Sequence, residues 1–388
     1  MSGQLRHRVD ERVGAQANAV AAVPPSAAAV SVWASVRAAL PAWLLARAIV
    51  LGGLWYAAAT HDGPLVAGPD SDVRALVVWD VVWYRRLGEE GYLAYGPLES
   101  RFFPLLPASV GVGQFLRLPT GPWMLAVCWV AALAFAAALH RLMLVESGDE
   151  RAARRAAWLV QLVPGANALV LGYTEALAGF LAVAYFLALR TRSTIGIPVG
   201  ILSGLARPTG PLLALAGAVE LLRPGSRGRL GWSARAAVVA APVLGTAVYL
   251  AWAWRAFGDP LTPYRVQAGS DLRRGVVSLS VEFLFRTSPG GYRWQLVLAL
   301  LIAAVGMLYV CARRLPAAYT VWAAVGMAAA VTAYGLHSLP RYLAAIFPLA
   351  MAAAIVLHRR WLWWPALGLC VAGFAWVSYL NLTSTPVP

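Results

Sequence analysis

The chain has 388 residues, of which 60% are hydrophobic and only 13% are charged. Because an average soluble domain carries about a quarter charged residues, this composition excludes disordered, collagen-like and disulfide-framework proteins and argues against a soluble enzyme. A helix needs roughly 20 apolar residues to cross the hydrocarbon of a membrane, so the length allows about ten to twelve crossings.

The charge balance is strongly basic. All 32 basic residues are arginines, against 17 acidic residues, which gives a net charge of +15. In a multispanning protein such an excess is typical of arginine-rich cytoplasmic loops and of contact with lipid headgroups, and not of nucleic-acid binding. The 3 cysteines form no Cys-x-x-Cys pair and no Cys/His ligand spacing, so the sequence predicts neither disulfides nor a zinc site.

Residues 1–37 lack a helical apolar face and are interpreted as a flexible cytoplasmic tail. The first apolar stretch is long and contains Arg47, which favours a retained signal anchor over a cleaved signal peptide. Arg47 itself either faces the interior of a bundle or extends to the interface. Apolar stretches recur at 38–59, 122–144, 157–171, 175–190, 194–206, 209–222, 236–254, 294–311, 316–335, 342–357 and 361–380. They predict an all-α polytopic membrane protein of about 11 transmembrane helices, with one domain over residues 38–380 and an outer tail over residues 381–388.

The stretch 102–117 is ambiguous, because it has only 16 residues and carries two prolines. If it does not cross and the N-terminus is cytoplasmic, 18 arginines lie inside and 13 outside; if it crosses, the two numbers exchange. The positive-inside rule favours the first topology. We therefore expect a helix near the outer surface here. Two long outer segments follow from this topology, 60–121 with interfacial helices and 255–293, and the chemistry is expected on them.

The first outer segment contains a predicted amphipathic helix. Trp79, Trp83 and Leu87 recur at positions i, i+4 and i+8, and they form a face suited to lying in the membrane interface. Asp80 falls at the beginning of this helix, where the helix dipole and free backbone N–H groups favour an ionised carboxylate that can accept a proton. The alternative is that Asp80 is only an N-cap.

Two further charged residues lie at the outer ends of apolar stretches. Glu175 is either a solvated cap or a site residue. Arg207 lies at the tip of a predicted tight hairpin over residues 204–213, and a guanidinium buried at that depth requires a partner. A phosphate group is a suitable partner, and the alternative is that the side chain extends to the lipid headgroups.

The last candidates lie on the second outer segment and near the C-terminal stretches. Asp259 precedes a proline and predicts a turn. Tyr264 and Gln267 follow it on an extended or short helical piece. His337 and Arg341 are expected at the outer mouth of the bundle, where His337 is either an interfacial histidine or a catalytic one.

Six segments of the chain resemble one protein family. In order they are WDVVWYRRLGEEGY, RFFPLLP, VPGANALVLGYTEAL, GLARPTGPLL, FGDPLTPYRVQ and LPRYLAAIFPLA. In this order they resemble GPI mannosyltransferase II, the class V phosphatidylinositol-glycan enzyme, and its bacterial relatives, from about residue 40 to residue 360. The family belongs to the GT-C glycosyltransferases, which are multispanning enzymes that use lipid-phosphate sugars and carry a catalytic acid in the first outer loop.

The resemblance implies roles for single residues. Asp80 matches the family's first-loop aspartate, although Val81 and Val82 follow it where many relatives have small residues. Ala206 stands where the family's arginine motif usually has threonine. The remaining matches are Glu175 in the Tyr-Thr-Glu segment that contains Tyr173, and Arg207, Asp259, Gln267 and Arg341.

The resemblance implies an inverting mannosyltransferase of the plasma membrane. It would take mannose from a polyprenyl-phosphate donor and deliver it to a lipid-linked or glycan acceptor at the extracytoplasmic face, with Asp80 as the general base. The expected donor-phosphate residues are Arg207, Arg341 and His337. The expected acceptor or sugar residues are Glu175, Tyr173, Trp79, Trp83, Asp259, Tyr264 and Gln267.

No cofactor and no nucleic-acid partner is expected, because arginines suffice to balance a phosphate charge; a divalent metal held by Asp80 and Glu175 is the alternative. Other functions stay open: a GT-C transferase of another polyprenyl-phosphate sugar such as arabinose or glucose, a lipid or glycan transporter, and a non-catalytic membrane subunit. A transporter predicts charged residues in mid-span, whereas here Arg47 is the exception and polar residues gather at the outer ends.

Overall fold

The computed structural model describes residues 31–60, 76–77, 79–223, 231–269, 294–332 and 338–383. The regular structure of these residues is entirely helical, which confirms the prediction of an all-α protein. The elements are α3 (Val32–Thr60), α4 (Asp80–Glu90), η1 (Tyr92–Ala94), η2 (Pro97–Arg101), α5 (Leu105–Phe115), α6 (Thr120–Ser147), α7 (Glu150–Leu162), η3 (Ala166–Leu169), α8 (Glu175–Thr191), α9 (Gly196–Ala206), η4 (Gly210–Leu212), α10 (Leu213–Leu222), α11 (Trp232–Phe257), α12 (Thr262–Gly269), α14 (Trp294–Arg314), α15 (Ala317–Val331), α16 (Leu339–Ala345), α17 (Phe347–Val356) and α18 (Arg360–Leu382).

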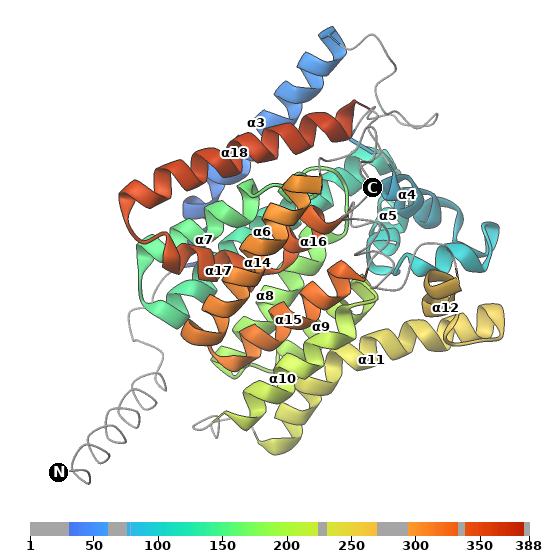
Figure 1. The fold of residues 1–388 in the computed structure, drawn as a ribbon. Helices are drawn as coiled ribbons and strands as arrows, with labels where there is room; N and C mark the ends of the chain where they lie inside the picture. Colours follow the sequence, from blue (N-terminus) through green and yellow to red (C-terminus); the bar gives the residue numbers. More distant parts are fainter. Residues whose placement is uncertain are drawn as a thin grey trace.

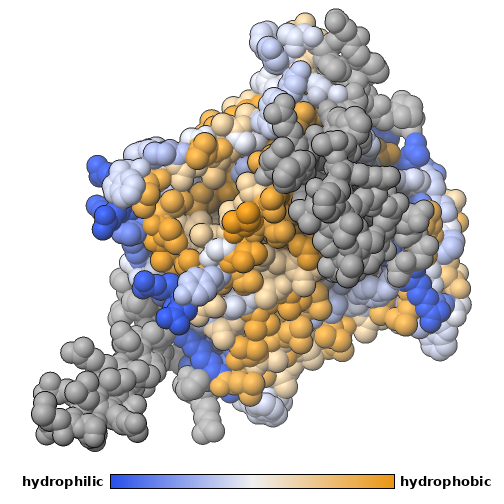
Figure 2. Space-filling view, viewed as in Figure 1, coloured by the Kyte–Doolittle hydropathy of each residue, from blue (hydrophilic) through white to orange (hydrophobic). Residues whose placement is uncertain are grey.

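The described helices include 5 that are long and apolar enough to cross a membrane, namely α3, α6, α11, α14 from Leu296 onward, and α18. A further candidate is the pair α16 and α17, bent by 75°. Apolar side chains on these spans are exposed, as expected where lipid replaces water, and Figure 2 shows a broad apolar region between more hydrophilic edges. The chain is therefore treated as a multi-pass membrane protein, and the number of about 11 crossings stays a prediction.

Two of the predicted apolar stretches are not single helices. In the stretch 157–171, α7 ends at Leu162, because a proline follows and Gly165 adopts φ +89°, a conformation that favours glycine. In the stretch 342–357, α16 ends at Ala345 and α17 begins at Phe347, since Pro348 lacks the N–H that would continue the helix. Both breaks supply irregular backbone at the cavity described below.

The described part of the first outer segment forms a helical hairpin of α4 and α5 at one end of the bundle (Figure 1). The helix expected over residues 77–92 is observed as α4. A Cβ at Gly88 would lie 2.5 Å from the carbonyl oxygen of Pro107, so glycine is what lets α4 and α5 approach. The stretch 102–117 contains α5, which is about 16 Å long at 1.5 Å per residue and too short to cross the roughly 30 Å of hydrocarbon by itself.

The main core joins α3, α6, α7, α8 and α17, with α18 packed beside α3 and α7 (Figure 1). Aromatic rings fill its centre. The ring of Phe186 lies 4.8 Å from that of Tyr319 and 5.2 Å from that of Phe347, and all three side chains are fully buried. Helices α9 and α11 pack so closely that small residues are required at their contact.

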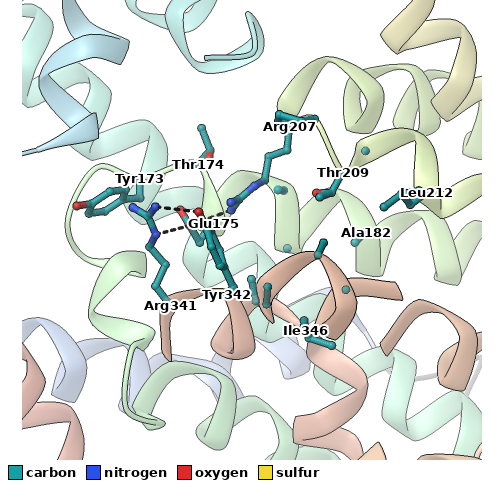
Figure 3. Close-up of a pocket in the computed structure, with 18 of the residues that line it drawn as sticks. Tyr173, Thr174, Glu175, Ala182, Arg207, Thr209, Leu212, Arg341, Tyr342 and Ile346 are labelled. Carbon is teal, nitrogen blue, oxygen red and sulfur yellow. Dashed lines mark hydrogen bonds and ion pairs between the residues drawn. The ribbon is translucent and has the colours of Figure 1, made fainter. Parts of the chain in front are cut away.

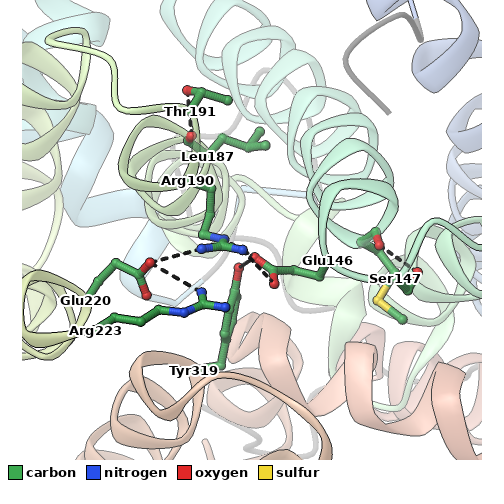
Figure 4. Close-up of polar contacts among 9 residues, drawn as sticks. Glu146, Ser147, Leu187, Arg190, Thr191, Glu220, Arg223 and Tyr319 are labelled. Carbon is green, nitrogen blue, oxygen red and sulfur yellow. Dashed lines mark hydrogen bonds and ion pairs between the residues drawn. The ribbon is translucent and has the colours of Figure 1, made fainter. Parts of the chain in front are cut away.

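A buried polar network ties four helices together at the end of α8 that lies away from Glu175 (Figure 4). Arg190 of α8 bonds Glu146 of α6 and lies 3.0 Å from Glu220 of α10. Tyr319 of α15 donates to Glu146 at 2.7 Å, and Arg223 lies 3.4 Å from Glu220. Because each buried charge has a partner, the network is satisfied and fixes these helix ends relative to one another.

Candidate functional site

A cavity of about 410 Å³ lies where the described ends of α4, α8, α9, α15 and α16 meet (Figure 3). One part of its wall is polar and carries the charged side chains Asp80, Arg101, Glu175, Arg207 and Arg341. The other part is apolar and includes Ala182, Leu212, Leu213, Trp322, Gly326 and Ile346. The cavity is therefore amphipathic, with charge gathered on one side and an apolar surface extending into the bundle.

Four charged residues from distant parts of the chain form a connected quartet in the polar wall. Both terminal nitrogens of Arg341 donate to Oδ2 of Asp80 at 3.2 Å. Nε of Arg341 lies 3.2 Å from Oε1 of Glu175, and Nη1 of Arg207 lies 2.8 Å from the same oxygen. The two carboxylates balance the two guanidinium groups, which is the condition under which charges are tolerated at this depth.

Glu175 lies at the centre of the quartet. It is the first residue of α8, where the helix dipole favours a carboxylate, but its side chain is only 2% exposed and faces Arg207 and Arg341 from between them (Figure 3). The structure therefore places it in the cavity and not on a solvated helix cap. Its second oxygen, Oε2, is buried and has no hydrogen-bond partner among the described residues, which leaves an acceptor free for a ligand hydroxyl.

Asp80 is the most accessible member of the quartet. It begins α4, and its side chain is 36% exposed. A purely capping role does not describe the contacts of Asp80, because Oδ2 of its carboxylate accepts hydrogen bonds from both terminal nitrogens of Arg341. The other oxygen, Oδ1, is left to accept a proton or a hydrogen bond from a molecule in the cavity.

The two arginines of the quartet differ in how many of their donors are used. Arg341 donates hydrogen bonds to Asp80 and to the hydroxyl of Tyr342, forms an ion pair with Glu175, and lies 4.6 Å from the ring centre of Tyr173. Arg207 makes one ion pair, and no hydrogen bond joins its Nε or Nη2 to the described residues. Burial alone would lower the pKa of Arg207, but the Glu175 carboxylate outweighs it, so the pKa is raised and the guanidinium stays charged.

The position of Arg207 is set by its neighbours along the chain. It follows the last residue of α9 and adopts an extended conformation there. The hydroxyl of Tyr264 donates to the carbonyl of Pro208 at 3.0 Å, and the Tyr264 ring packs against Phe103. Tyr264 thus supports the backbone beside Arg207 without lining the cavity, whereas Gln267, one turn further along α12, lines it.

Several predicted site residues lie away from the cavity. Trp79 and Trp83 are not among its lining residues, and Trp83 packs on the rings of Tyr95 and Phe102. Asp259 stabilises the turn before α12, because it accepts from the backbone N–H of Leu261 at 3.0 Å and pairs with Arg265 at 2.9 Å. His337 lies outside the described residues.

The cavity also contains residues that the sequence did not single out. Tyr84 and Tyr342 carry hydroxyl groups in its wall, and Arg101 adds a third cation. Tyr84 follows Asp80 by one helical turn, a spacing that places both on one face, and burial raises the pKa of its hydroxyl, so it stays protonated. This i, i+4 relation was available from the sequence, and Arg101 is the first residue of the RFFPLLP segment that contributes to the resemblance.

Asp80 and Glu175, the two carboxylates that would hold a divalent metal, both face arginine side chains. Within the described ranges no three His, Cys, Asp or Glu side chains gather into a potential metal site. Each of the two carboxylates already faces a guanidinium at 3.2 Å or less, and these cations repel a second positive charge.

Comparison with solved structures identifies the fold class. The fold is of the GT-C type, as the sequence predicted. It is similar to the oligosaccharyltransferase of Archaeoglobus fulgidus tethered to an acceptor peptide, with 14% identity and a TM-score of 0.50. The same values are found for the archaeal oligosaccharyltransferase AglB from that organism in complex with an inhibitory peptide and a dolichol-phosphate. In both cases the match covers 91% of this chain and 56% of the other, so this chain spans about half the length of those proteins.

No protein-family model matches the chain, and no curated protein is significantly similar to it in sequence.

Proposed function

We propose that the protein is a membrane mannosyltransferase that transfers mannose from a polyprenyl-phosphate-mannose donor to a lipid-linked or glycan acceptor at the extracytoplasmic face of the plasma membrane. The observation that carries the proposal is the cavity in which Asp80 shares a wall with Arg207 and Arg341. Such a site holds a candidate base and anion-binding groups in one enclosed space, which is what sugar transfer from a lipid phosphate requires.

The shape of the cavity supports a lipid-phosphate donor. Guanidinium groups are suitable partners for a phosphate, and the apolar wall continues from them toward Trp322 and Ile346, where an isoprenoid chain would remain in an apolar environment. The solved structure of the archaeal neighbour with a dolichol-phosphate agrees with this ligand class.

The proposed reaction is one inverting displacement. An acceptor hydroxyl gives its proton to Oδ1 of Asp80 while its oxygen bonds to C1 of the sugar on the face opposite the phosphate. The bond between C1 and the phosphate oxygen breaks, and polyprenyl phosphate leaves with the electron pair. Arg207 has donors free to stabilise the charge that develops on this leaving group, and Arg341 holds Asp80 in place.

Glu175 is proposed to orient the sugar. Its Oε2 has no partner in the described structure, and a sugar hydroxyl would satisfy it. Gln267 and the hydroxyl of Tyr84 are further polar groups in the same wall. A site built to bond a hydroxyl discriminates strongly against an analogue that lacks it, so this wall is where the choice between mannose and another sugar would be made.

The test of the proposed base is Asp80→Asn, assayed in membranes with radiolabelled polyprenyl-phosphate-mannose. We expect transfer to fall by about 10²- to 10⁴-fold, because a positioned base contributes that much. Glu90→Gln is the matched control, since it changes an exposed carboxylate of the same helix. If Asp80→Asn transferred mannose at the wild-type rate, Asp80 would not be the base.

The same assay separates the alternatives. Labelled glucose or arabinose on the same lipid competes with mannose if the donor sugar differs. Movement of the intact donor between leaflets without sugar transfer would indicate a transporter. If substitution of both Asp80 and Glu175 reduced neither sugar transfer nor donor movement, the protein would be a non-catalytic subunit.

Metal dependence is tested by EDTA. Because arginines, and not a divalent ion, are proposed to balance the phosphate charge, we expect the transfer rate to be unchanged by excess EDTA. Loss of transfer that Mn²⁺ or Mg²⁺ restores would contradict this part of the proposal.

A further inference from the structure

Arg47 is buried in the first long span without an acidic partner. Its side chain lies in α3 and is only 4% exposed. No carboxylate of the described residues lies within ion-pair distance of it. A cation at this depth is unfavourable, so its presence requires groups that bind it strongly in another way.

The partners of Arg47 are carbonyl oxygens and aromatic rings. Nη1 donates to Oε1 of Gln161 at 3.1 Å, and Nη2 donates to the backbone carbonyl of Leu169 at 3.0 Å. The guanidinium lies 4.3 Å from the ring centre of Trp43 and 5.7 Å from that of Trp129. Arg47 therefore does not extend to the interface; it faces the interior and bonds the backbone between α7 and α8.

The backbone between α7 and α8 is a largely irregular segment that is buried in the bundle. Residues 163–174 link α7 to α8 and contain only the short helix η3. Irregular backbone inside a membrane protein needs internal partners for its polar groups. Arg47 supplies one at Leu169, and the indole N–H of Trp129 supplies the next, because it donates to the carbonyl of Val170 at 2.7 Å.

The opposite side of the same segment touches the quartet. A Cβ at Gly165 would lie 2.2 Å from the carbonyl carbon of Pro340 and 2.7 Å from the backbone nitrogen of Arg341. At its other end the segment places the ring of Tyr173 beside the Arg341 guanidinium and leads directly into Glu175. A shift of this segment would therefore move both Glu175 and Arg341.

We infer that Arg47 is a positioning residue for the sugar-transfer site: it fixes the segment 163–174 from inside the membrane and so sets the placement of Glu175 against Arg341. The inference rests on the proposed function for its effect on transfer. Its structural part, the restraint of the segment by Arg47, does not depend on that function.

The first arm of the test is hydrogen exchange of the purified full chain in nanodiscs, read by mass spectrometry. We expect Arg47→Met to increase the exchange of amides in 163–174 by about tenfold or more, because opening of a segment follows its local stability. Peptides from α9 serve as the internal reference and should not change. Arg155→Met is the matched control, because Arg155 is also buried, at 9% exposure, but contacts Trp363 of α18 and not this segment.

The second arm is a double-mutant cycle on donor transfer. Arg47→Met is expected to lower kcat/KM for the donor about tenfold in the unchanged protein and to have little further effect in a Glu175→Gln background, because residues acting through one another are not additive. The effect of Arg155→Met, whatever its size, should be the same in both backgrounds. Trp129→Phe, which removes the donor to Val170 but keeps an aromatic ring near Arg47, provides a milder variant if Arg47→Met yields too little protein.

The two arms separate the two claims. Unchanged exchange in 163–174 for both Arg47→Met and Trp129→Phe would overturn the inference, as would equal losses of kcat/KM in the presence and absence of Glu175. Increased exchange in a protein that transfers no sugar at all would support the restraint by Arg47 and refute the proposed function alone.

Discussion

At the scale of single residues, the two arginines of the quartet have similar burial but different roles. Arg341 donates hydrogen bonds to Asp80 and Tyr342 and forms an ion pair with Glu175. Arg207 forms an ion pair with Glu175 through Nη1, and no hydrogen bond joins its Nε or Nη2 to the described residues. Because a phosphate needs unoccupied donors, Arg207 is the stronger candidate for its recognition, and Arg341 orients the two carboxylates.

Arg207→Ala is expected to raise the KM for the donor about 10- to 100-fold, since hydrogen bonds to charged groups contribute about 1.5–3 kcal/mol. The KM of Arg207→Lys should lie between that of the wild-type protein and that of Arg207→Ala, because an ammonium retains the charge but not the planar pair of donors. The measurement is the initial rate of sugar transfer against donor concentration. Arg265→Ala is the control, since that side chain is 69% exposed. An unchanged KM with reduced protein yield would mean that Arg207 has only a structural role.

The chemical types of the site residues were accessible from the sequence, but their contacts were not. A carboxylate at a helix start and an arginine at a hairpin tip indicate chemistry through local physics alone. The bond between Asp80 and Arg341 joins residues 261 positions apart, and no periodicity or spacing encodes such a distance. Asp259, whose own context predicts a turn and which only the resemblance assigned to the site, stabilises that turn outside the cavity.

At the scale of helices, α9 and α11 pack in close contact. A Cβ at Gly204 would lie 2.1 Å from the carbonyl oxygen of Pro242, and a Cβ at Gly245 would lie 2.0 Å from that of Ile201. Small residues at such contacts are how membrane helices pack without a hydrophobic driving force. Since Arg207 immediately follows α9, this contact also determines where its guanidinium enters the cavity.

Gly204→Ala is expected to destabilise the protein by about 1–3 kcal/mol, because the added methyl group overlaps backbone atoms that cannot move independently. Gly306→Ala is the matched control: it lies within α14 with no atom within 4 Å of the added carbon, and there alanine should be neutral or stabilising by about 0.5–1 kcal/mol. The measurement is thermal unfolding in detergent. Destabilisation of equal size by both substitutions would show that the effect is not one of packing.

Helix positions were predicted well where apolar runs are uninterrupted, as in α6. They were predicted poorly where Pro164 or Pro348 divides a run that hydropathy alone reads as continuous. The physical reason is that hydropathy measures transfer to lipid, whereas proline acts on backbone hydrogen bonding. Both divided runs border the cavity.

At the scale of the whole molecule, the predicted orientation places the quartet outside the cell and the network around Arg190 inside. Single cysteines at Leu261 and Thr194 test this, because these exposed positions lie in the turns before α12 and α9. A membrane-impermeant maleimide should label Leu261→Cys in intact cells and Thr194→Cys only after permeabilisation. The native Cys128 and Cys311 are buried and should give little background, and the partly exposed Cys370 is replaced by serine. The reverse labelling pattern would place the cavity on the cytoplasmic side.

The network around Arg190 has a mechanical consequence for the cavity. Helices α8, α10 and α15 each contribute to the cavity near one end and to the network near the other, and along α8 the two sites are roughly 22 Å apart at 1.5 Å per residue. With one end pinned by paired charges, these helices can separate only by pivoting about that end. Displacement then grows with distance from the pinned ends, so the widest separation of these helices arises beside Glu175 while the pinned ends stay closed.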